Sequence, residues 1–160
     1  MIWKNLHFFW SGPFSQWYPA EFVVNGKKFT CAEQFMMYKK AEFFGDEETA
    51  EKIMSTSDPK IQKALGRKVR GFNVDAWNEN AKAFVYMGNY NKFTQNSNLL
   101  KKLFDTKGTT LVEASPYDTI WGIGLTEDNP SALDRKKWRG TNWLGEILTS
   151  LREDLMNDNS

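Results

Sequence analysis

The sequence has 160 residues, a length that suits one domain with a sizeable buried core. Its 21 basic and 20 acidic residues leave a formal net charge of +1, which argues against a protein that binds nucleic acid mainly through bulk charge. The single cysteine, Cys31, excludes an intrachain disulfide, and one cysteine with one histidine nearly excludes a metal site of the usual His/Cys kind.

No apolar run approaches the roughly 18 residues that cross a bilayer, and no signal-peptide pattern opens the chain. We therefore expect a cytoplasmic protein with no membrane partner. Aromatic residues make up 15% of the chain, so that bases or flavin-like rings are plausible ligands, although most of these side chains are expected in the core.

Turn and capping residues divide the chain into short elements. In chain order, the sequence predicts a strand at 6–10, a hairpin of strands 21–24 and 27–29, helices at 31–44, 46–55, 59–66, 76–93 and 98–105, strands at 109–114 and 119–122, and a helix at 142–155. The hairpin rests on Asn25-Gly26, the dipeptide most typical of a two-residue turn. Pro59 in a first turn and Asp75 as a cap mark two helix starts. The pattern predicts an α+β fold, one compact and mainly helical domain over residues 1–160 with a small β-sheet.

One acid and one base lie on the helix predicted after the hairpin. Glu33 and Lys40 are seven residues apart, about two helical turns, so that their side chains point the same way. A carboxylate at a helix N-terminus is kept ionised by the helix dipole, which suits a group that stabilises positive charge on a sugar ring. The alternative is structural, because Thr30-x-x-Glu33 also has the spacing of a capping box.

Lys40 likewise has two interpretations. A helix lysine is ordinarily solvated, but the apolar neighbours on this helix favour a lysine drawn into a pocket, with a lowered pKa or a bound phosphate. Lys39 points elsewhere and is the natural control. Cys31 is expected to be a small buried side chain rather than a nucleophile.

A second candidate region lies near the C-terminus. Residues 135–139 (Arg-Lys-Lys-Trp-Arg) lead into Gly140-Thr141-Asn142 at the start of the last predicted helix. Free amides at a helix N-terminus beside cations form a natural phosphate site, and a solvated basic turn is the alternative. The glycines of Trp121-Gly122-Ile123-Gly124 suit a tight turn or a close approach of backbone to a ligand, and the motif is too short for a dinucleotide fingerprint.

Short motifs spread over nearly the whole chain resemble one known family. They are Phe14-Ser15-Gln16-Trp17-Tyr18-Pro19, Ala32-Glu33-Gln34 with Lys40-Ala41, Phe44-Gly45-Asp46, Leu65-Gly66-Arg67-Lys68-Val69, Trp77, Lys92-Phe93, Leu99-Leu100, Leu111-Val112-Glu113-Ala114-Ser115, Asp118 with Trp121-Gly122-Ile123-Gly124, and Gly140-x-Asn142-x-Leu144-Gly145 with Arg152. In this order the motifs resemble the NADAR family.

The resemblance implies an N-glycosidase that cleaves the bond between ribose C1 and an exocyclic amine. One type in the family hydrolyses ribosylamine intermediates of riboflavin biosynthesis, and another removes ADP-ribose from modified guanine in DNA. Two positions depart from the family pattern. Gln16 stands where an asparagine is common, and Ile123 stands where the riboflavin type can carry an aspartate, which favours the ADP-ribose type.

The resemblance also implies roles for individual residues. Glu33 and Lys40 are expected to be catalytic, Glu33 by stabilising the cationic sugar or activating water and Lys40 by orienting the ribose, with a Schiff base as an open hypothesis. The expected substrate-binding residues are Ser15, Gln16, Trp17, Tyr18, Arg67, Asp118, Trp121, Gly122 and Asn142. We expect no metal and no cofactor.

The expected partner is a substrate that contains ADP-ribose or ribose phosphate, including ADP-ribosylated DNA, with a functional pairing to an ADP-ribosyltransferase toxin. A rival from another class is a module that binds ADP-ribose or a related nucleotide without cleaving it. A binder of single-stranded nucleic acid is a third possibility, which the near-zero net charge weakens.

Overall fold

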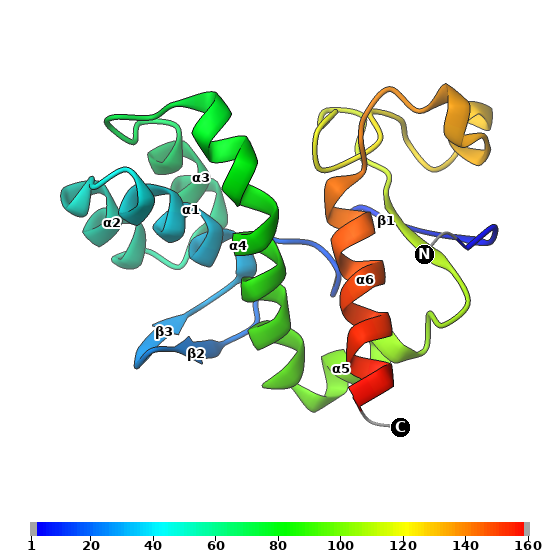
Figure 1. Cartoon of the computed structure of the whole chain (residues 1–160), viewed down its shortest axis with the longest axis horizontal. Coiled ribbons are helices and arrows are strands. Elements are labelled where there is room, and N and C mark those ends of the chain that lie inside the picture. The colour runs from blue at the N-terminus through cyan, green and yellow to red at the C-terminus, as the bar shows by residue number, and fades with distance from the viewer. Residues whose placement is uncertain (1–2, 159–160) are drawn as a thin grey trace. The chain divides into compact units, whose positions relative to one another are not determined.

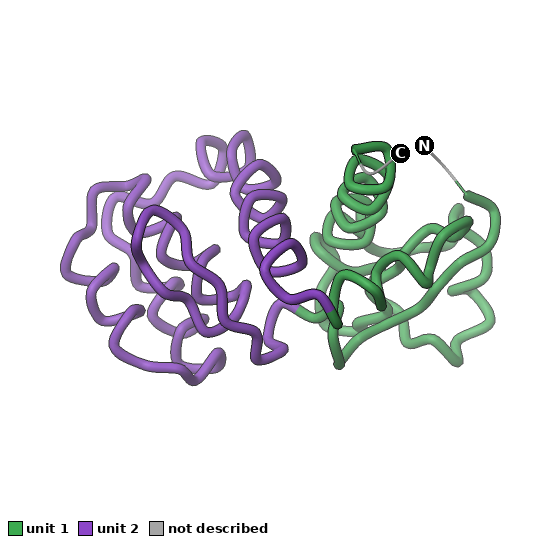
Figure 2. Tube along the Cα trace, turned by 90° about the horizontal axis from the view of Figure 1, so that it is seen from below, with its two compact units in different colours: residues 1–15, 98–160 green, residues 16–97 purple. Residues whose placement is uncertain are grey.

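The computed structural model describes residues 3–158, and the chain divides into two compact units (Figure 2). One unit combines the N-terminal segment up to residue 15 with the chain from residue 98 onward, and the other comprises residues 16–97. The described residues form six α-helices, two short 3-10 helices and two two-stranded sheets. This confirms the predicted α+β fold, whereas the single-domain organisation remains a prediction.

The unit of residues 16–97 begins with the predicted hairpin. Strands β2 (Phe22–Val24) and β3 (Lys27–Phe29) pair antiparallel, with Phe22 opposite Phe29. Asn25 and Gly26 both have positive φ, 50° and 79°, as a two-residue turn of the mirror-image type requires. The hairpin prediction is confirmed.

Four helices complete this unit (Figure 1): α1 (Ala32–Phe43), α2 (Glu47–Met54), α3 (Pro59–Gly66) and α4 (Val74–Thr94). Helix α1 is central, because it packs against α2, α3 and α4, while α4 also packs against β2. Phe22, Phe29 and Phe35 form a buried cluster that joins the hairpin to α1. The apolar residues of both elements therefore fix α1, which carries Glu33 and Lys40.

The other unit is built on two parallel strands, β1 (Leu6–Phe9) and β4 (Thr110–Glu113), paired from Leu6 opposite Thr110 to Phe9 opposite Glu113. Helix α6 (Trp143–Asp158) packs against β4. The unit also holds most of α5 (Ser97–Phe104) and the 3-10 helices η1 (Pro130–Leu133) and η2 (Arg135–Lys137). Its core includes Val112, Ile123, Leu125 and Ala132.

One predicted strand is not formed, and one predicted helix begins at a different residue. Residues 119–122 form no strand, because the carbonyls of Ile120, Trp121 and Gly122 accept hydrogen bonds from the amides of residues 142–144 instead of from a neighbouring strand. Helix α4 begins at Val74, two residues before the predicted start, and its cap is Asn73, whose side chain accepts a hydrogen bond from the Ala76 amide. Asp75 lies inside the first turn, where the helix dipole also favours an acid.

Candidate active site

Glu33 lies in the first turn of α1, and it does not act as the acid of a capping box. The N-cap is Cys31, which places Gln34 at the third helical position, and the Gln34 Oε1 accepts the Thr30 amide at 2.8 Å and the Thr30 hydroxyl at 3.0 Å. Glu33 is therefore not needed for capping. Its side chain, 7% exposed, accepts a hydrogen bond from the indole Nε1 of Trp17 at 3.4 Å.

Lys40 lies on the same helix and is half-buried. Its ammonium is 4.5 Å from the ring centroid of Phe72 and 5.9 Å from that of Trp77. Burial lowers the pKa of Lys40, the negative charge of Glu33 opposes this shift, and the positive charge of Arg67 adds to it. This electrostatic coupling agrees with the predicted common face of Glu33 and Lys40. Lys39 differs, since it forms an ion pair with Glu42 at 3.0 Å.

Five aromatic side chains form a chain of ring contacts whose two ends both meet Lys40. The centroid distances are 5.4 Å for Phe72 and Phe44, 5.0 Å for Phe44 and Phe43, 6.0 Å for Phe43 and Phe84, and 5.9 Å for Phe84 and Trp77. Phe43 and Phe72 are 42% and 44% exposed, so their ring surface is available to a ligand. We call this group the Lys40 aromatic ring set.

None of these five side chains was among the predicted site residues. Phe43 and Phe44 were predicted only as apolar neighbours of Lys40 on the same helix. Phe72 lies in the loop after Gly71, a position with φ of 78°, and no periodicity connects it to Lys40. Only the packing of α1 against α4 brings these segments together.

The loop of residues 16–18 lies beside the first turn of α1. The Glu33 amide donates a hydrogen bond to the Gln16 carbonyl at 2.9 Å, and the Gln16 Oε1 accepts one from the Asn89 amide nitrogen at 2.8 Å. Trp17 is 41% exposed, and the Lys63 ammonium lies 5.9 Å from its ring centroid. Together with Arg67, which is exposed at the C-terminus of α3, these residues give the site an aromatic and cationic border.

The remaining predicted residues, Ser15, Asp118, Trp121, Gly122 and Asn142, belong to the other unit. The Asp118 carboxylate accepts hydrogen bonds from the amides of Ile120 and Trp121 at 2.9 and 2.8 Å. It thereby stabilises the turn of residues 118–121. A side chain at Gly122 would meet the Glu113 carbonyl and carboxylate at 2.9 Å, which explains the glycine by close packing. The Ser15 amide donates to the Gly12 carbonyl, and the Trp121 ring lies edge-on to Trp143.

Asn142 is fully buried, and its side chain links α6 to β4. Its Oδ1 accepts the Glu113 amide at 2.9 Å and its Nδ2 donates to the Leu111 carbonyl at 3.1 Å. The amides of residues 142–144 donate to carbonyls of residues 120–122. These three amides at the helix start are therefore not available to bind a phosphate.

The NADAR domain model matches residues 8–156. The chain belongs to the NADAR family. It is 45% identical over 146 residues to an N-glycosidase of Acanthamoeba polyphaga mimivirus, with 88% of this chain and 86% of that protein covered. It is 27% identical to the riboflavin biosynthesis protein PYRR of Zea mays, with 91% of this chain but only 23% of PYRR covered.

The fold of the NADAR chain also matches a solved structure. The NMR structure of YbiA from E. coli superimposes with a TM-score of 0.81 at 26% identity, covering 99% of this chain and 89% of YbiA. The predicted family and fold class are both confirmed. In this NADAR fold Ile123 is fully buried in the core with Val112 and Leu125, where an apolar side chain suits the packing.

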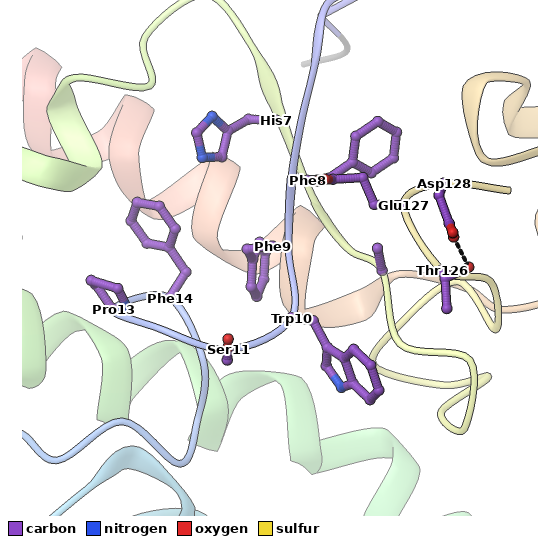
Figure 3. A pocket seen from close by; sticks show the side chains of 11 residues that line it. His7, Phe8, Phe9, Trp10, Ser11, Pro13, Phe14, Thr126, Glu127 and Asp128 are labelled. Carbon is purple, nitrogen blue, oxygen red and sulfur yellow. Dashed lines mark hydrogen bonds between the residues drawn. The ribbon is translucent and has the colours of Figure 1, made fainter. Parts of the chain in front are cut away.

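A pocket of about 580 Å³ lies elsewhere in the NADAR chain, in the unit that contains β1. Its walls come from both faces of that strand: His7, Phe9 and Phe14 lie on one side and Phe8 and Glu127 on the other (Figure 3). None of the predicted site residues lines it, and its charged groups are the acids Glu127 and Asp128. An acidic border does not suit a phosphate ligand.

Within residues 3–158, no group of three or more His, Cys, Asp or Glu side chains is placed to hold a metal ion. Over the same residues, no helix is long and apolar enough to cross a membrane.

Proposed function

We propose that the chain hydrolyses the N-glycosidic bond between ribose C1 and an exocyclic amine, with the Glu33 carboxylate at the centre of the site. Glycosyl hydrolysis in general follows from membership in a family with relatives named N-glycosidase. This membership confirms the predicted enzyme class. The observation that carries the proposal is the buried Glu33 carboxylate, held by the Trp17 indole and electrostatically coupled to Lys40.

In the proposed reaction, the bond between C1 and nitrogen breaks while a water oxygen bonds to C1. The amine leaves with one proton, and the water supplies both that proton and the hydroxyl of the free sugar. Positive charge develops on the ribose ring in the transition state, and a fixed carboxylate stabilises that charge or removes a proton from the water. Glu33 is suited to this role because the Trp17 hydrogen bond and the helix N-terminus keep it in place.

Lys40 would orient the ribose or its phosphate from the same face. Burial lowers the pKa of Lys40, so a neutral amine is more accessible to it than to a solvated lysine. A Schiff base between Lys40 and the opened ribose is therefore a second hypothesis for the same step. Borohydride in the presence of substrate would trap such an intermediate as a stable adduct on Lys40.

The Lys40 aromatic ring set and Trp17 would hold the base or the adenine, and Arg67 and Lys63 would hold phosphate. Exposed aromatic faces stack heterocycles, and cations on a site border attract anionic ligands. We propose ADP-ribose on guanine in DNA as the first substrate, because an ADP-ribosyl base brings two heterocycles and two phosphates to such a surface. An ADP-ribosyltransferase toxin would produce that substrate.

A second candidate substrate is a ribosylaminopyrimidine phosphate of riboflavin biosynthesis. The similarity to PYRR of Zea mays supports it. Because the matched region is 23% of that protein, the similarity does not transfer the activity of the whole of PYRR to this chain. Both substrates share the bond to be cleaved.

The decisive measurement is release of ADP-ribose from an oligonucleotide that carries ADP-ribosylated guanine. Wild type should release it, Glu33→Gln and Lys40→Ala should not, and Lys39→Ala should retain activity, since Lys39 pairs with Glu42 on the helix surface. No release would redirect the assay to ribosylaminopyrimidine phosphates. If neither is consumed while ADP-ribose raises the melting temperature, the protein is a binding module.

A further inference from the structure

Lys92, in the last turn of α4, is fully buried, and the proposed chemistry does not use it. Its ammonium lies 5.9 Å from the ring centroid of Tyr18 and 5.0 Å from that of Phe93. Burying a lysine side chain completely costs free energy, because the charge loses its hydration. Apolar packing alone would be served better by a methionine or leucine, so the amine calls for another explanation.

The neighbours of Lys92 lead directly to Glu33. Tyr18 belongs to the loop of residues 16–18, and Asn89, one helical turn before Lys92 on α4, bonds to Gln16 of the same loop at 2.8 Å. The Gln16 carbonyl of that loop accepts a hydrogen bond from the Glu33 amide. The Trp17 indole Nε1 of the same loop donates to the Glu33 carboxylate at 3.4 Å. The end of α4 thus supports the loop that fixes the orientation of Glu33.

We propose that Lys92 is a positioning residue: its buried ammonium, beneath the Tyr18 ring, holds the loop of residues 16–18 so that Trp17 aligns the Glu33 carboxylate. This inference rests on the proposed function of Glu33. A cation attracts the face of an aromatic ring, most strongly where water is excluded, so the charged form of Lys92 fixes Tyr18 more firmly than the neutral form does.

The protonation of Lys92 makes this positioning dependent on pH. Burial lowers the pKa of Lys92 to about 7, against an opposing contribution from Cys31 at the start of α1. The Tyr18 phenol also faces Lys92. Of the elements packed against α4, β2 contributes only Phe22, Val23 and Val24, and α1 carries the charged side chains of Glu33, Lys39, Lys40 and Glu42. Burial also raises the pKa of the Cys31 thiol.

The first test compares kcat as a function of pH in wild type, Lys92→Met and Lys92→Arg. Wild type should lose activity as the pH rises through about 7. Lys92→Met has a similar shape without the charge and should show a kcat roughly tenfold lower, with no inflection there. Lys92→Arg stays charged and should keep the high rate across the same range. If Lys92→Met had the same kcat and the same dependence of kcat on pH as wild type, the proposal would be overturned.

Two controls test an exposed lysine of α4 and the histidine as origins of an inflection near neutral pH. Lys82→Met removes an exposed lysine from the same helix and should leave the profile unchanged. His7→Gln removes the one histidine of the sequence, which lies in the other unit, and should leave the inflection in place. Loss of the inflection in His7→Gln would assign it to His7 and refute the role of Lys92.

A readout without turnover separates this inference from the proposed function. The indole N–H resonance of Trp17, assigned with Trp17→Phe, should shift in wild type with a midpoint near pH 7 and should not shift in Lys92→Arg. If no substrate is cleaved but the shift is present, the proposed function fails and the positioning stands. If substrate is cleaved and the resonance does not titrate, the positioning is wrong. Wild type and Lys92→Arg are sufficient for this test, so it does not depend on the folding of Lys92→Met.

Discussion

At the scale of single residues, Glu33 is a buried acid that is not required to cap its helix. Because Gln34 bonds to Thr30, the helix start is stable without the Glu33 carboxylate. Substituting Glu33 should therefore affect chemistry far more than folding. Structural acids show the opposite pattern, since their removal leaves an amide or cation without its partner.

We expect Glu33→Gln to lower kcat by roughly a hundred- to ten-thousand-fold, the range for removing a positioned acid or base. The melting temperature should change little, because the amide keeps the shape and can still accept the Trp17 hydrogen bond. Steady-state rates and thermal melts of the same preparation check both statements. Glu42→Gln, an exposed acid on the same helix, is the control and should match wild type. Equal rates in both variants would remove Glu33 from the mechanism.

Because Lys92 is buried, we expect the free energy of unfolding to depend on pH. The pKa of Lys92 is lowered to about 7 in the folded protein from an ordinary 10.5, so between these values the unfolded chain binds more protons. The free energy of unfolding should therefore rise with pH across this window, by up to about 5 kcal/mol from this group, and be insensitive to Lys92 below it.

Urea unfolding at pH 7 and pH 9 measures this dependence. Lys92→Met should abolish the part of the increase that comes from Lys92 and should be more stable than wild type at pH 7, since no charge is buried. A variant that combines higher stability with lower kcat would show that the lysine serves activity at the expense of stability. The same increase with pH in Lys92→Met and wild type would contradict the assignment.

At the scale of elements, the contact between α6 and the turn before β4 depends on Arg152. This fully buried guanidinium donates to the Thr106 carbonyl at 2.9 Å and to the Thr109 carbonyl at 2.6 Å, and pairs with Glu153 at 2.9 Å. The planar, branched donor group reaches both carbonyls of the turn at once, which a lysine cannot do. Arg152 thereby connects the C-terminal helix to the strand that pairs with β1.

Arg152→Met should lower the free energy of unfolding by about 3 kcal/mol, because the Thr109 carbonyl loses the guanidinium donor, the Thr106 carbonyl loses one of its donors, and Glu153 loses its cation. Chemical denaturation measures the loss. Lys107→Met changes an exposed cation in the same turn and should have little effect. If the two variants were equally stable, the contact between α6 and this turn would not depend on Arg152.

At the scale of the whole molecule, the chain path ties the two units together. Strands β1 and β4 pair in parallel, and the residues 16–97 of the other unit lie between them in sequence. The β1–β4 pair therefore forms only after a long crossover has closed. This connection favours the predicted single domain, because the unit that contains β1 is assembled from two stretches of chain separated by the whole of the other unit.

We expect a single unfolding transition, and the distribution of signals makes this testable. Five of the seven tryptophans, Trp3, Trp10, Trp121, Trp138 and Trp143, belong to the unit with β1, whereas α1–α4 belong to the other. Tryptophan fluorescence thus reports mainly on one unit, and the far-UV circular dichroism signal has its larger helical part in the other. Coincident denaturation curves would support one cooperative domain, and two separated midpoints would show two.

The sequence by itself determined the features that depend on local spacing. The Asn25-Gly26 turn, the start of α3 at Pro59 and the common face of Glu33 and Lys40 all follow from backbone preferences and helical period, which neighbouring residues set among themselves. The family resemblance added the chemistry of the site, which spacing alone left open between catalysis and capping.

Only the tertiary structure decided the rest. Packing of α1 against α4 brings Phe72 and Trp77 to Lys40, and it buries Lys92 near the loop that carries Trp17. Residues 119–122 were predicted as a strand, yet the carbonyls of residues 120–122 accept hydrogen bonds from the start of α6. The physical reason is common to all three: burial and hydrogen-bond partners depend on segments distant in sequence, whose approach no local pattern specifies.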